Sequence, residues 1–214
     1  FFGLYTRTIH CTRGEHLAYT LPDGSTIEMN AASEVSYHPF WWSIKRTVSL
    51  EGEAFFSVKK GSNFTVVSQK GTTQVLGTSF NISTRNDHYE VFCATGKVRV
   101  AANNTSEEII LTSNMFARIN GKLEVVNVMS ADHVLAWKEN KFHFNARVLQ
   151  EVFDEIERQY DITVQLEVDK ATELTYSGHF NRSKTPEEVL NLICHPFGYT
   201  FVKQENGNYK VSQN

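Results

Sequence analysis

Two groups of side chains in the first half of the chain have the types needed for chemistry on carbohydrates. Glu51 and Glu53 are carboxylates separated by one residue, and sugar hydrolases use paired carboxylates as acid and base. Phe40, Trp41 and Trp42 form an aromatic run that could stack on sugar rings or on a protein partner. A carbohydrate-binding or carbohydrate-hydrolysing β-sandwich is therefore one candidate function.

Each group also has a simpler structural interpretation. The carboxylates of hydrolases usually come from different strands, whereas Glu51 and Glu53 fall on one face of a predicted strand, so a solvated strand face is the better interpretation. Successive strand residues point to opposite faces, so at most two residues of the aromatic run share one environment. An exposed aromatic patch at Phe40, Trp41 and Trp42 is kept as a prediction.

The cysteines and histidines give no support to metal chemistry. Cys11, Cys93 and Cys194 include no CxxC pair, and the eight histidines form neither HxH nor HExxH. We therefore expect no metal and no cofactor. The sequence is compatible with a disulfide between Cys11 and Cys93 and equally with three separate thiols.

The composition is that of a globular protein. Its 214 residues, 41% of them hydrophobic, can form one or two domains of the usual ~100–200 residues. The formal net charge is -3, without a basic stripe, so we expect no nucleic-acid partner. No run approaches the ~20 apolar residues that cross a bilayer.

The first part of the chain, from about residue 8 to 130, reads as strand after strand. Pro22-Asp23-Gly24 has the residues of a tight turn ahead of a strand at 26–30. Between 48 and 58 apolar side chains take the even positions, which is typical of a strand with one buried face. These features predict a mainly β domain, a sandwich or β-solenoid of short antiparallel strands. Further strands are expected at 64–68, 73–83, 88–94, 97–101, 108–111, 115–119 and 123–129.

The pattern changes after about residue 138. Apolar residues at three-to-four spacing predict a helix over 146–160 with Asn145 as its N-cap. Thr185-Pro186-Glu187-Glu188 is a capping box that starts a second helix, which should end near 195. With strands at 141–144, 162–167, 174–180, 199–203 and 208–212, the order predicts a small α+β domain of split βαβ type.

We place the domain boundary beside Trp137, giving a β-rich domain over 1–137 and an α+β domain over 138–214. Trp137 is then a residue of the junction. Its ring either packs against both domains, as an interdomain residue, or belongs to the core of one domain only.

Three sequence blocks follow one another in the first half of the chain, at residues 21–30, 48–56 and 75–81, which read LPDGSTIEMN, VSLEGEAFF and VLGTSFN. Their order and spacing resemble the FecR family of bacterial cell-envelope anti-sigma regulators. The tail is similar as well: Phe142-His143-Phe144 and the segment 176–180 look like the C-terminal domain of Bacteroidetes-type members, which resembles small signalling modules of secretins and TonB-dependent transducers. The similarity covers nearly the whole chain.

The resemblance implies a signalling relay in the cell envelope. FecR-like proteins hold an ECF sigma factor in the cytoplasm and receive, in the periplasm, the signalling domain of a TonB-dependent outer-membrane transporter. We therefore expect this chain to be the periplasmic portion of a single-pass inner-membrane anti-sigma factor. Its cytoplasmic sigma-binding segment and membrane helix lie outside this sequence.

The resemblance also implies a candidate reaction at Gly77 and Thr78, in a chain otherwise expected not to be an enzyme. Some FecR-like regulators cut themselves at a Gly-Thr bond in this block, where the threonine hydroxyl attacks the preceding carbonyl. The residue types suit that chemistry, because glycine tolerates a strained backbone and a hydroxyl is the nucleophile. The simpler interpretation is that Gly77 permits close strand approach and Thr78 is a strand residue.

We place the partner-binding surface in the C-terminal domain. Small split βαβ domains leave unpaired backbone groups at their edges, which a strand of a partner can extend. The predicted edge strands are 174–180 and 208–212. Their candidate contact residues are Leu174, Tyr176, Ser177, Phe180, Tyr209 and Val211.

Overall fold

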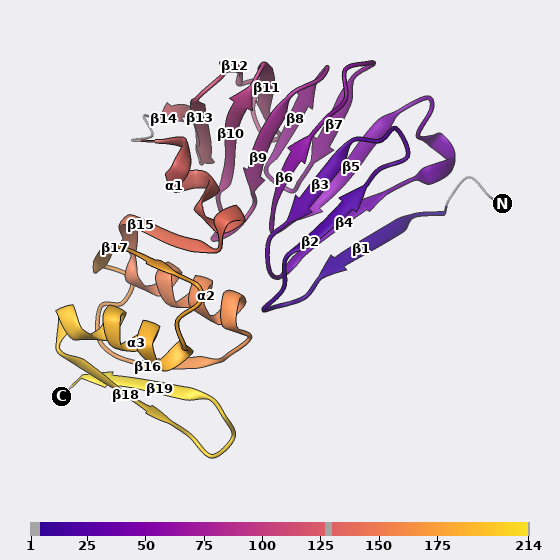
Figure 1. The fold of residues 1–214 in the computed structure, drawn as a ribbon. Helices are drawn as coiled ribbons and strands as arrows, with labels where there is room; N and C mark the ends of the chain where they lie inside the picture. The colour runs from indigo at the N-terminus through magenta and orange to yellow at the C-terminus, as the bar shows by residue number, and fades with distance from the viewer. Residues whose placement is uncertain (1–4, 127–129, 214) are drawn as a thin grey trace. The chain divides into compact units, whose positions relative to one another are not determined.

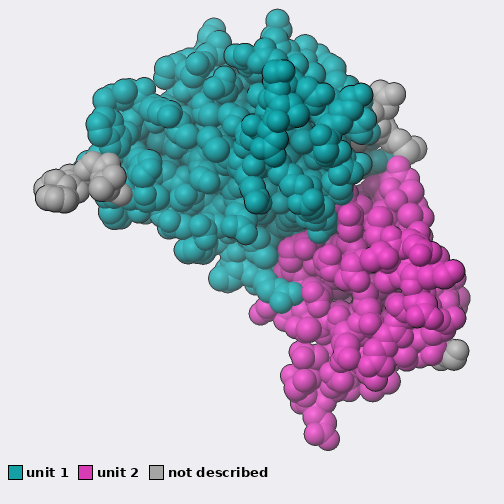
Figure 2. All heavy atoms as spheres, turned by 180° about the vertical axis from the view of Figure 1, so that it is seen from behind, with its two compact units in different colours: residues 1–134 teal, residues 135–214 magenta. Residues whose placement is uncertain are grey.

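The computed structural model describes residues 5–126 and 130–213, and the chain divides into two compact units. Unit 1 is Phe1–Val134 and unit 2 is Leu135–Asn214 (Figure 2). Unit 1 is made mainly of strands, and unit 2 combines strands with helices (Figure 1). The predicted fold class, a mainly β domain followed by a small α+β domain, is confirmed.

Unit 1 consists of two sheets, each with seven strands among the residues described. One sheet has the order β1-β4-β5-β7-β8-β11-β12 and the other β2-β3-β6-β9-β10-β13-β14, so both grow in chain order. Neighbours are antiparallel except β5 and β7, which are parallel. The strands are β1 (Arg7–Cys11), β2 (Leu17–Thr20), β3 (Thr26–Met29), β4 (Ser33–Tyr37), β5 (Arg46–Glu51), β6 (Glu53–Ser57), β7 (Phe64–Val67), β8 (Gly71–Val75), β9 (Ser79–Ser83), β10 (Tyr89–Thr95), β11 (Lys97–Ala102), β12 (Glu108–Thr112), β13 (Met115–Asn120) and β14 (Lys122–Val126).

Both sheets of unit 1 contribute to one hydrophobic core. Alternate residues of β3, β4, β5, β7, β8 and β11 are buried, as the period of two predicts, whereas β6, β9 and β10 each have three consecutive buried residues. A series of aromatic contacts runs through this core, with successive ring centroids 5.1–6.1 Å apart, so large flat side chains fill much of the space. The rings belong to Tyr37, Trp42, Phe64, Phe56 and Phe80.

Two predicted single strands are in fact pairs of strands that lie in different sheets. The run 48–58 is divided at Gly52 into β5 and β6, and the run 73–83 is divided around Gly77 into β8 and β9. The alternation continues through the Gly52 corner, because both strands point their even-numbered residues into the same core. At the Gly77 corner the buried positions change from odd (Thr73, Val75) to even (Thr78, Phe80). Periodicity therefore does not mark the change of sheet at Gly52, whereas a shift in the alternation accompanies the one at Gly77.

The corner at Gly52 also separates the two carboxylates suggested as a hydrolase pair. Glu51 ends β5 and is exposed, whereas Glu53 begins β6 in the other sheet. The Glu53 carboxylate accepts hydrogen bonds from the side-chain amides of Asn30 (2.8 Å) and Asn81 (2.9 Å). The expectation that both carboxylates share one strand face is wrong, and Glu53 has a structural role in joining β3, β6 and β9.

Unit 2 contains two small sheets and two main helices. β15 (Lys141–Val148) pairs with β17 (Thr175–Asn181), while β19 (Tyr209–Gln213) lies between β16 (Val164–Glu167) and β18 (Tyr199–Lys203). The helices are α2 (Leu149–Tyr160) and α3 (Pro186–Cys194), and their apolar faces pack into a separate core. The short helices α1 (Ala131–Leu135) and η3 (Ala136–Glu139) precede β15.

The start of α2 differs from the prediction, whereas the start of α3 agrees with it. α2 begins at Leu149 after Val148, so Asn145 is not its N-cap and lies within β15. Thr185 accepts from the backbone N–H of Glu188, whose side chain accepts from the Thr185 N–H, so the capping box is confirmed. A strand bulge explains the error: Ala146 has φ of +46° and its N–H donates to the Ser177 hydroxyl, 2.8 Å away.

The three cysteines, Cys11, Cys93 and Cys194, are all buried thiols. Of the two alternatives left open by the sequence, the structure has separate thiols. Burial raises the pKa of the Cys93 and Cys194 thiols to about 11, so both stay protonated and unreactive at neutral pH.

Gly52 is a position where a side chain cannot be accommodated. Its φ is +94°, and a Cβ there would lie 2.5 Å from Ser33 Oγ and 2.7 Å from Ser33 Cα. We expect Gly52→Ala to lower the free energy of unfolding of unit 1 by about 2–4 kcal/mol, measured by chemical denaturation. Gly121→Ala is the matched control, since Gly121 has φ of +69° with open space around it, and should cost only ~1 kcal/mol. Equal losses in the two variants would show that crowding at Gly52 is unimportant.

Candidate functional site

The corner at Gly77 and Thr78 is held by close packing and hydrogen bonds. A Cβ on Gly77 would lie 2.6 Å from Lys60 Cα, so only glycine fits without moving the backbone. The Thr78 carbonyl accepts from the Val58 N–H at 3.0 Å. The Thr78 hydroxyl is buried and donates to the Lys97 carbonyl at 3.0 Å. Gly77 therefore permits close approach of the loop at Lys60 rather than of a strand, and Thr78 lies between β8 and β9 instead of within a strand.

This geometry does not activate Thr78 as a nucleophile. A hydroxyl attacks efficiently when a neighbouring base accepts its proton. In the part of the chain that the structure describes, the hydrogen-bond partner of this hydroxyl is a backbone carbonyl, which is not a base. Self-cleavage between Gly77 and Thr78 thus has no support here, and Thr78 serves to join β9 to the start of β11.

We expect freshly purified protein to give one full-length band on a denaturing gel, and to keep it on storage. Thr78→Val should run identically and lose about 1 kcal/mol of unfolding free energy, because the Lys97 carbonyl loses its buried donor. Two fragments that meet at residue 77 in the unaltered chain, and are absent from Thr78→Val, would contradict this prediction.

Arg46 joins the loops at the same end of unit 1 as the Gly77 corner. Its guanidinium, with only 8% of the side chain exposed, donates to the Asp23 carboxylate at 2.8 Å and to the Lys59 carbonyl at 3.1 Å. It also donates to the Ser62 carbonyl and lies over the Phe64 ring, 5.8 Å from its centroid. One buried cation therefore holds the turn at 21–25 and the loop at 58–63 against the start of β5.

Asp23 is fixed on the other side by its own turn. Its carboxylate accepts from the Ser25 N–H at 3.0 Å and from the Ser25 hydroxyl at 2.8 Å, while the same hydroxyl accepts from the Lys59 N–H at 3.0 Å. Burial opposes ionisation of Asp23, but hydrogen bonds from Arg46 and Ser25 outweigh it and hold the pKa of Asp23 below its usual value. The Pro22-Asp23-Gly24 turn thus supplies the carboxylate of a buried ion pair with Arg46.

Asp23→Ala should lower the free energy of unfolding by roughly 3 kcal/mol at pH 7, since it leaves the Arg46 charge buried without its partner. The folded pKa of Asp23 lies below the unfolded value, so its contribution is complete above that unfolded value and disappears as the pH falls. The difference between the two proteins, measured by denaturant titration, should stay constant from about pH 7 to 5 and shrink below about pH 4. Glu124→Ala, at an exposed carboxylate, should change stability by less than about 0.5 kcal/mol. A pH-independent difference would contradict the role assigned to the carboxylate.

The aromatic run divides between surface and core. Phe40 and Trp41 are 58% and 49% exposed, whereas Trp42 is only 5% exposed and belongs to the core, so the prediction of a three-residue patch is wrong for Trp42. The reason is the short 3-10 helix η2 (Pro39–Trp41), which directs Trp42 inward. Tyr5 packs edge-on against Phe40 with centroids 6.1 Å apart, and Ile44 is 75% exposed. Sequence reasoning missed Tyr5, because only the pairing of β1 with β4 brings it to Phe40, and it also missed the exposed Ile44 in the same loop as Phe40.

The predicted partner-binding residues of unit 2 occupy two different environments. Ser177 lies exposed on β17, between the buried side chains of Tyr176 and Phe180, and the half-buried Leu174 comes just before the strand. Tyr209 and Val211 lie on β19, are at most 1% exposed, and belong to the core.

The prediction that 208–212 is an edge strand is wrong. β19 is paired on both sides, parallel to β16 and antiparallel to β18. Its backbone groups and its core-facing side chains are therefore not available to a partner. The strand 174–180 is different: among the residues described, β17 pairs only with β15.

Trp137 lies in η3 and is buried. A role as a residue between the two domains stays a prediction. Within the described residues, no group of three or more His, Cys, Asp or Glu side chains could hold a metal ion. Over the same residues, no helix has the length and apolar character needed to span a membrane.

Comparison with known proteins identifies the family. Residues 7–99 match the family model of the FecR protein, and residues 141–211 match that of the FecR C-terminal domain. The two matches fall on the two units, and the chain belongs to the FecR family. No curated protein matches the chain significantly.

Two crystal structures share the fold of this chain. Both are of a candidate anti-sigma factor from Parabacteroides distasonis ATCC 8503, which is 28% identical in sequence. One has a TM-score of 0.88 and the other 0.87, and the similarity covers 98% and 97% of this chain. It covers 100% and 99% of the two solved chains, so the similarity includes both units.

Proposed function

We propose that this chain is the sensor part of an anti-sigma regulator. The observation that carries the proposal is that FecR-family similarity extends over both units, together with a whole-chain likeness to a candidate anti-sigma factor. We infer a role in binding and transmission from the anti-sigma regulators that the chain resembles. The carbohydrate alternative loses its basis, because Glu53 is held by amides and Trp42 is in the core.

In this proposal the chain occupies the periplasm and binds the signalling domain of a TonB-dependent outer-membrane transporter. The regulated partner is an ECF sigma factor, which binds a cytoplasmic segment outside this sequence. Cargo capture by the transporter then changes the contact with this chain, and the change is passed through a membrane helix of the complete regulator. This chain needs no cofactor for that task, since the signal is carried by protein contacts.

The edge of β17 is the surface best suited to bind the signalling domain. An exposed strand edge presents N–H and C=O groups that an incoming strand can pair with. Edges that must stay unpaired usually carry charged residues. β18 ends in Lys203, which binds Glu187 at 3.0 Å, and β16 ends in Glu167, which binds Lys210 at 2.7 Å. β17 carries no Asp, Glu, Lys or Arg, so it lacks that protection.

The side chains of β17 fit the same role. Its exposed positions hold Thr175, Ser177, His179 and Asn181, none of which is Asp, Glu, Lys or Arg, while Tyr176 and Phe180 anchor the strand in the core. A partner strand can therefore approach without displacing a charge or exposing the core. The bulge at Ala146, fixed by the Ser177 hydroxyl, shapes the opposite side of this strand.

The test is hydrogen exchange with purified signalling domains of TonB-dependent transporters from the same genome. We expect one domain to bind and to slow amide exchange in 175–181, because strand addition protects the outer backbone groups of β17, while 199–203 on β18 is unchanged. His179→Pro should weaken binding at least tenfold, whereas Val202→Pro on β18 should leave it intact.

Both variants should leave the melting of unit 1 unchanged. Binding with protection confined to another segment would refute the β17 edge and keep the partner. Failure of every signalling domain of that genome to bind would refute the partner.

A further inference from the structure

One end of unit 1 combines exposed apolar side chains with lysines. Five large apolar residues there are between 49% and 75% exposed, which is unusual for positions so close together. We call this surface the lysine end. Its apolar members are Tyr5, Phe40, Trp41, Ile44 and Leu76, and its cations are Lys45, Lys59, Lys60 and Lys97.

Strand register brings these residues to one end. β5 and β7 are parallel with Arg46 opposite Phe64, so the loops 38–45 and 58–63, which precede these strands, lie at the same end. β8 is antiparallel to β7 with Val75 opposite Phe64, which brings Leu76 there, and the Gly61 N–H donates to the Leu76 carbonyl at 2.8 Å.

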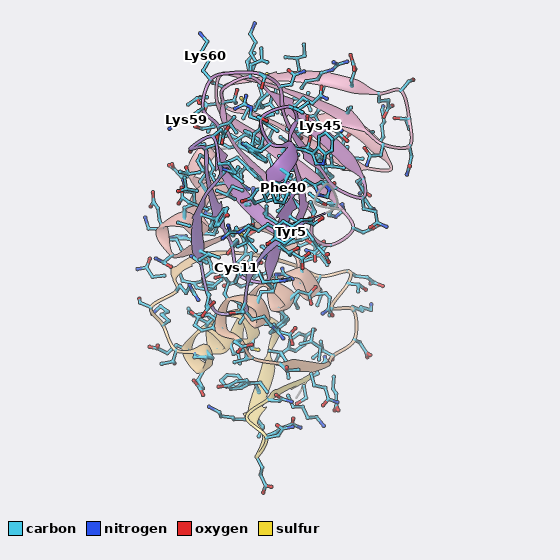
Figure 3. All side chains as sticks on the ribbon, turned by 90° about the vertical axis from the view of Figure 1, so that its right-hand side faces the viewer. Tyr5, Cys11, Phe40, Lys45, Lys59 and Lys60 are labelled. Carbon is cyan, nitrogen blue, oxygen red and sulfur yellow. The ribbon has the colours of Figure 1, made fainter. Side chains whose placement is uncertain are left out.

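The two flanks of the sheet extend the same surface. On β1, Arg7 pairs with Tyr37, so Tyr5 lies beside the loop that holds Phe40. On β11, Arg99 pairs with Gln74, which places Lys97 beside Leu76. From β1 to β11 the surface spans five strand spacings of about 4.8 Å each, or roughly 24 Å. Figure 3 labels Tyr5, Phe40 and three of the lysines, all on unit 1.

The exposed charges of the lysine end are positive. Its loops, 21–25, 38–45, 58–63, 76–78 and 95–97, contain a single carboxylate, Asp23, and Arg46 neutralises it in the buried ion pair. All four lysines are exposed, although the formal net charge of the chain is -3. The end therefore presents a positive surface on a negative protein.

Exposed apolar side chains beside lysines suit contact with a bilayer better than contact with a protein partner. Aromatic and aliphatic side chains enter the boundary between headgroups and acyl chains, while lysines keep their ammonium groups at the level of the phosphates. Each lysine near an anionic bilayer contributes about 1 kcal/mol. Protein interfaces, in contrast, are enriched in arginine and depleted in lysine. Among the described residues of this end, four exposed cations are lysines, and Arg7 at the start of β1 is an exposed arginine.

We propose that the lysine end docks on the surface of a bilayer that contains anionic phospholipid. Phe40, Trp41 and Ile44 insert, and Lys45, Lys59 and Lys60 contact lipid phosphates. This contact is peripheral and reversible, since it uses loop side chains and leaves both sheets intact. The inference is independent of the transporter partner proposed above.

The test uses the purified chain and vesicles of phosphatidylcholine with about a fifth of phosphatidylglycerol, analysed by flotation. We expect binding to these vesicles at low salt, at least tenfold weaker binding to pure phosphatidylcholine, and loss of binding at high salt. The triple change Lys45→Glu, Lys59→Glu and Lys60→Glu should weaken binding at least tenfold. So should the triple change Phe40→Ser, Trp41→Ser and Ile44→Ser.

The matched control is Ile110→Ser with Val125→Ser, two residues of unit 1 that are 64% and 49% exposed outside the lysine end, and it should bind as the unaltered chain does. Fluorescence gives a second readout that needs no variant. Trp41 is exposed while Trp42 and Trp137 are buried, so vesicles should shift the emission to shorter wavelength and brominated lipid should quench it. Equal binding to neutral and anionic vesicles, or binding unaltered in both triple variants, would overturn the proposal and favour a protein partner for this surface.

Discussion

The buried ion pair between Arg46 and Asp23 is the constraint on which the end of unit 1 depends. A guanidinium with 8% of its side chain exposed needs polar partners, and here its two terminal nitrogens bind a carboxylate and two backbone carbonyls, while its Nε has no hydrogen-bond partner among the described residues. Those partners belong to separate loops. The loops are thereby fixed in space, and the exposed side chains of Lys59 and Ile44 extend from a rigid frame.

The same pair explains why a turn without catalytic residues is informative. Pro22 and Gly24 give the backbone its turn, and Ser25 orients the Asp23 carboxylate toward Arg46. The Gly52 and Gly77 blocks are also structural, because each marks a corner where the chain passes from one sheet to the other. The blocks that resemble the FecR family therefore identify a scaffold. The surfaces that bind partners have to be found from exposure and charge.

Local signals were sufficient wherever a feature depends on neighbouring residues. The capping box of Thr185 and Glu188 was predictable, because both hydrogen bonds span three residues. The corner at Gly52 was not, because the apolar alternation continues through it into the same core, and the corner at Gly77 is accompanied only by a shift of the buried positions from odd to even numbers. The position of β19 between β16 and β18 was also beyond the sequence, since it depends on a parallel pairing of Val164 with Tyr209, 45 positions apart by their numbers. The contact between Tyr5 and Phe40 could not be predicted from the sequence either, because it depends on the pairing of β1 with β4.

The two surfaces assigned to the chain rely on different physical forces. The lysine end of unit 1 acts through charges that salt screens over a Debye length of about 8 Å at physiological ionic strength, so its contact weakens as salt rises. The β17 edge of unit 2 is proposed to bind through backbone hydrogen bonds, and β17 carries no Asp, Glu, Lys or Arg. Its affinity for a partner strand should therefore depend little on salt concentration. Measuring binding at low and high ionic strength therefore distinguishes the membrane contact from the strand-pairing contact without any amino-acid substitution. A regulator with both surfaces can rest one unit on a membrane by electrostatics and leave the other to recognise its partner by strand pairing.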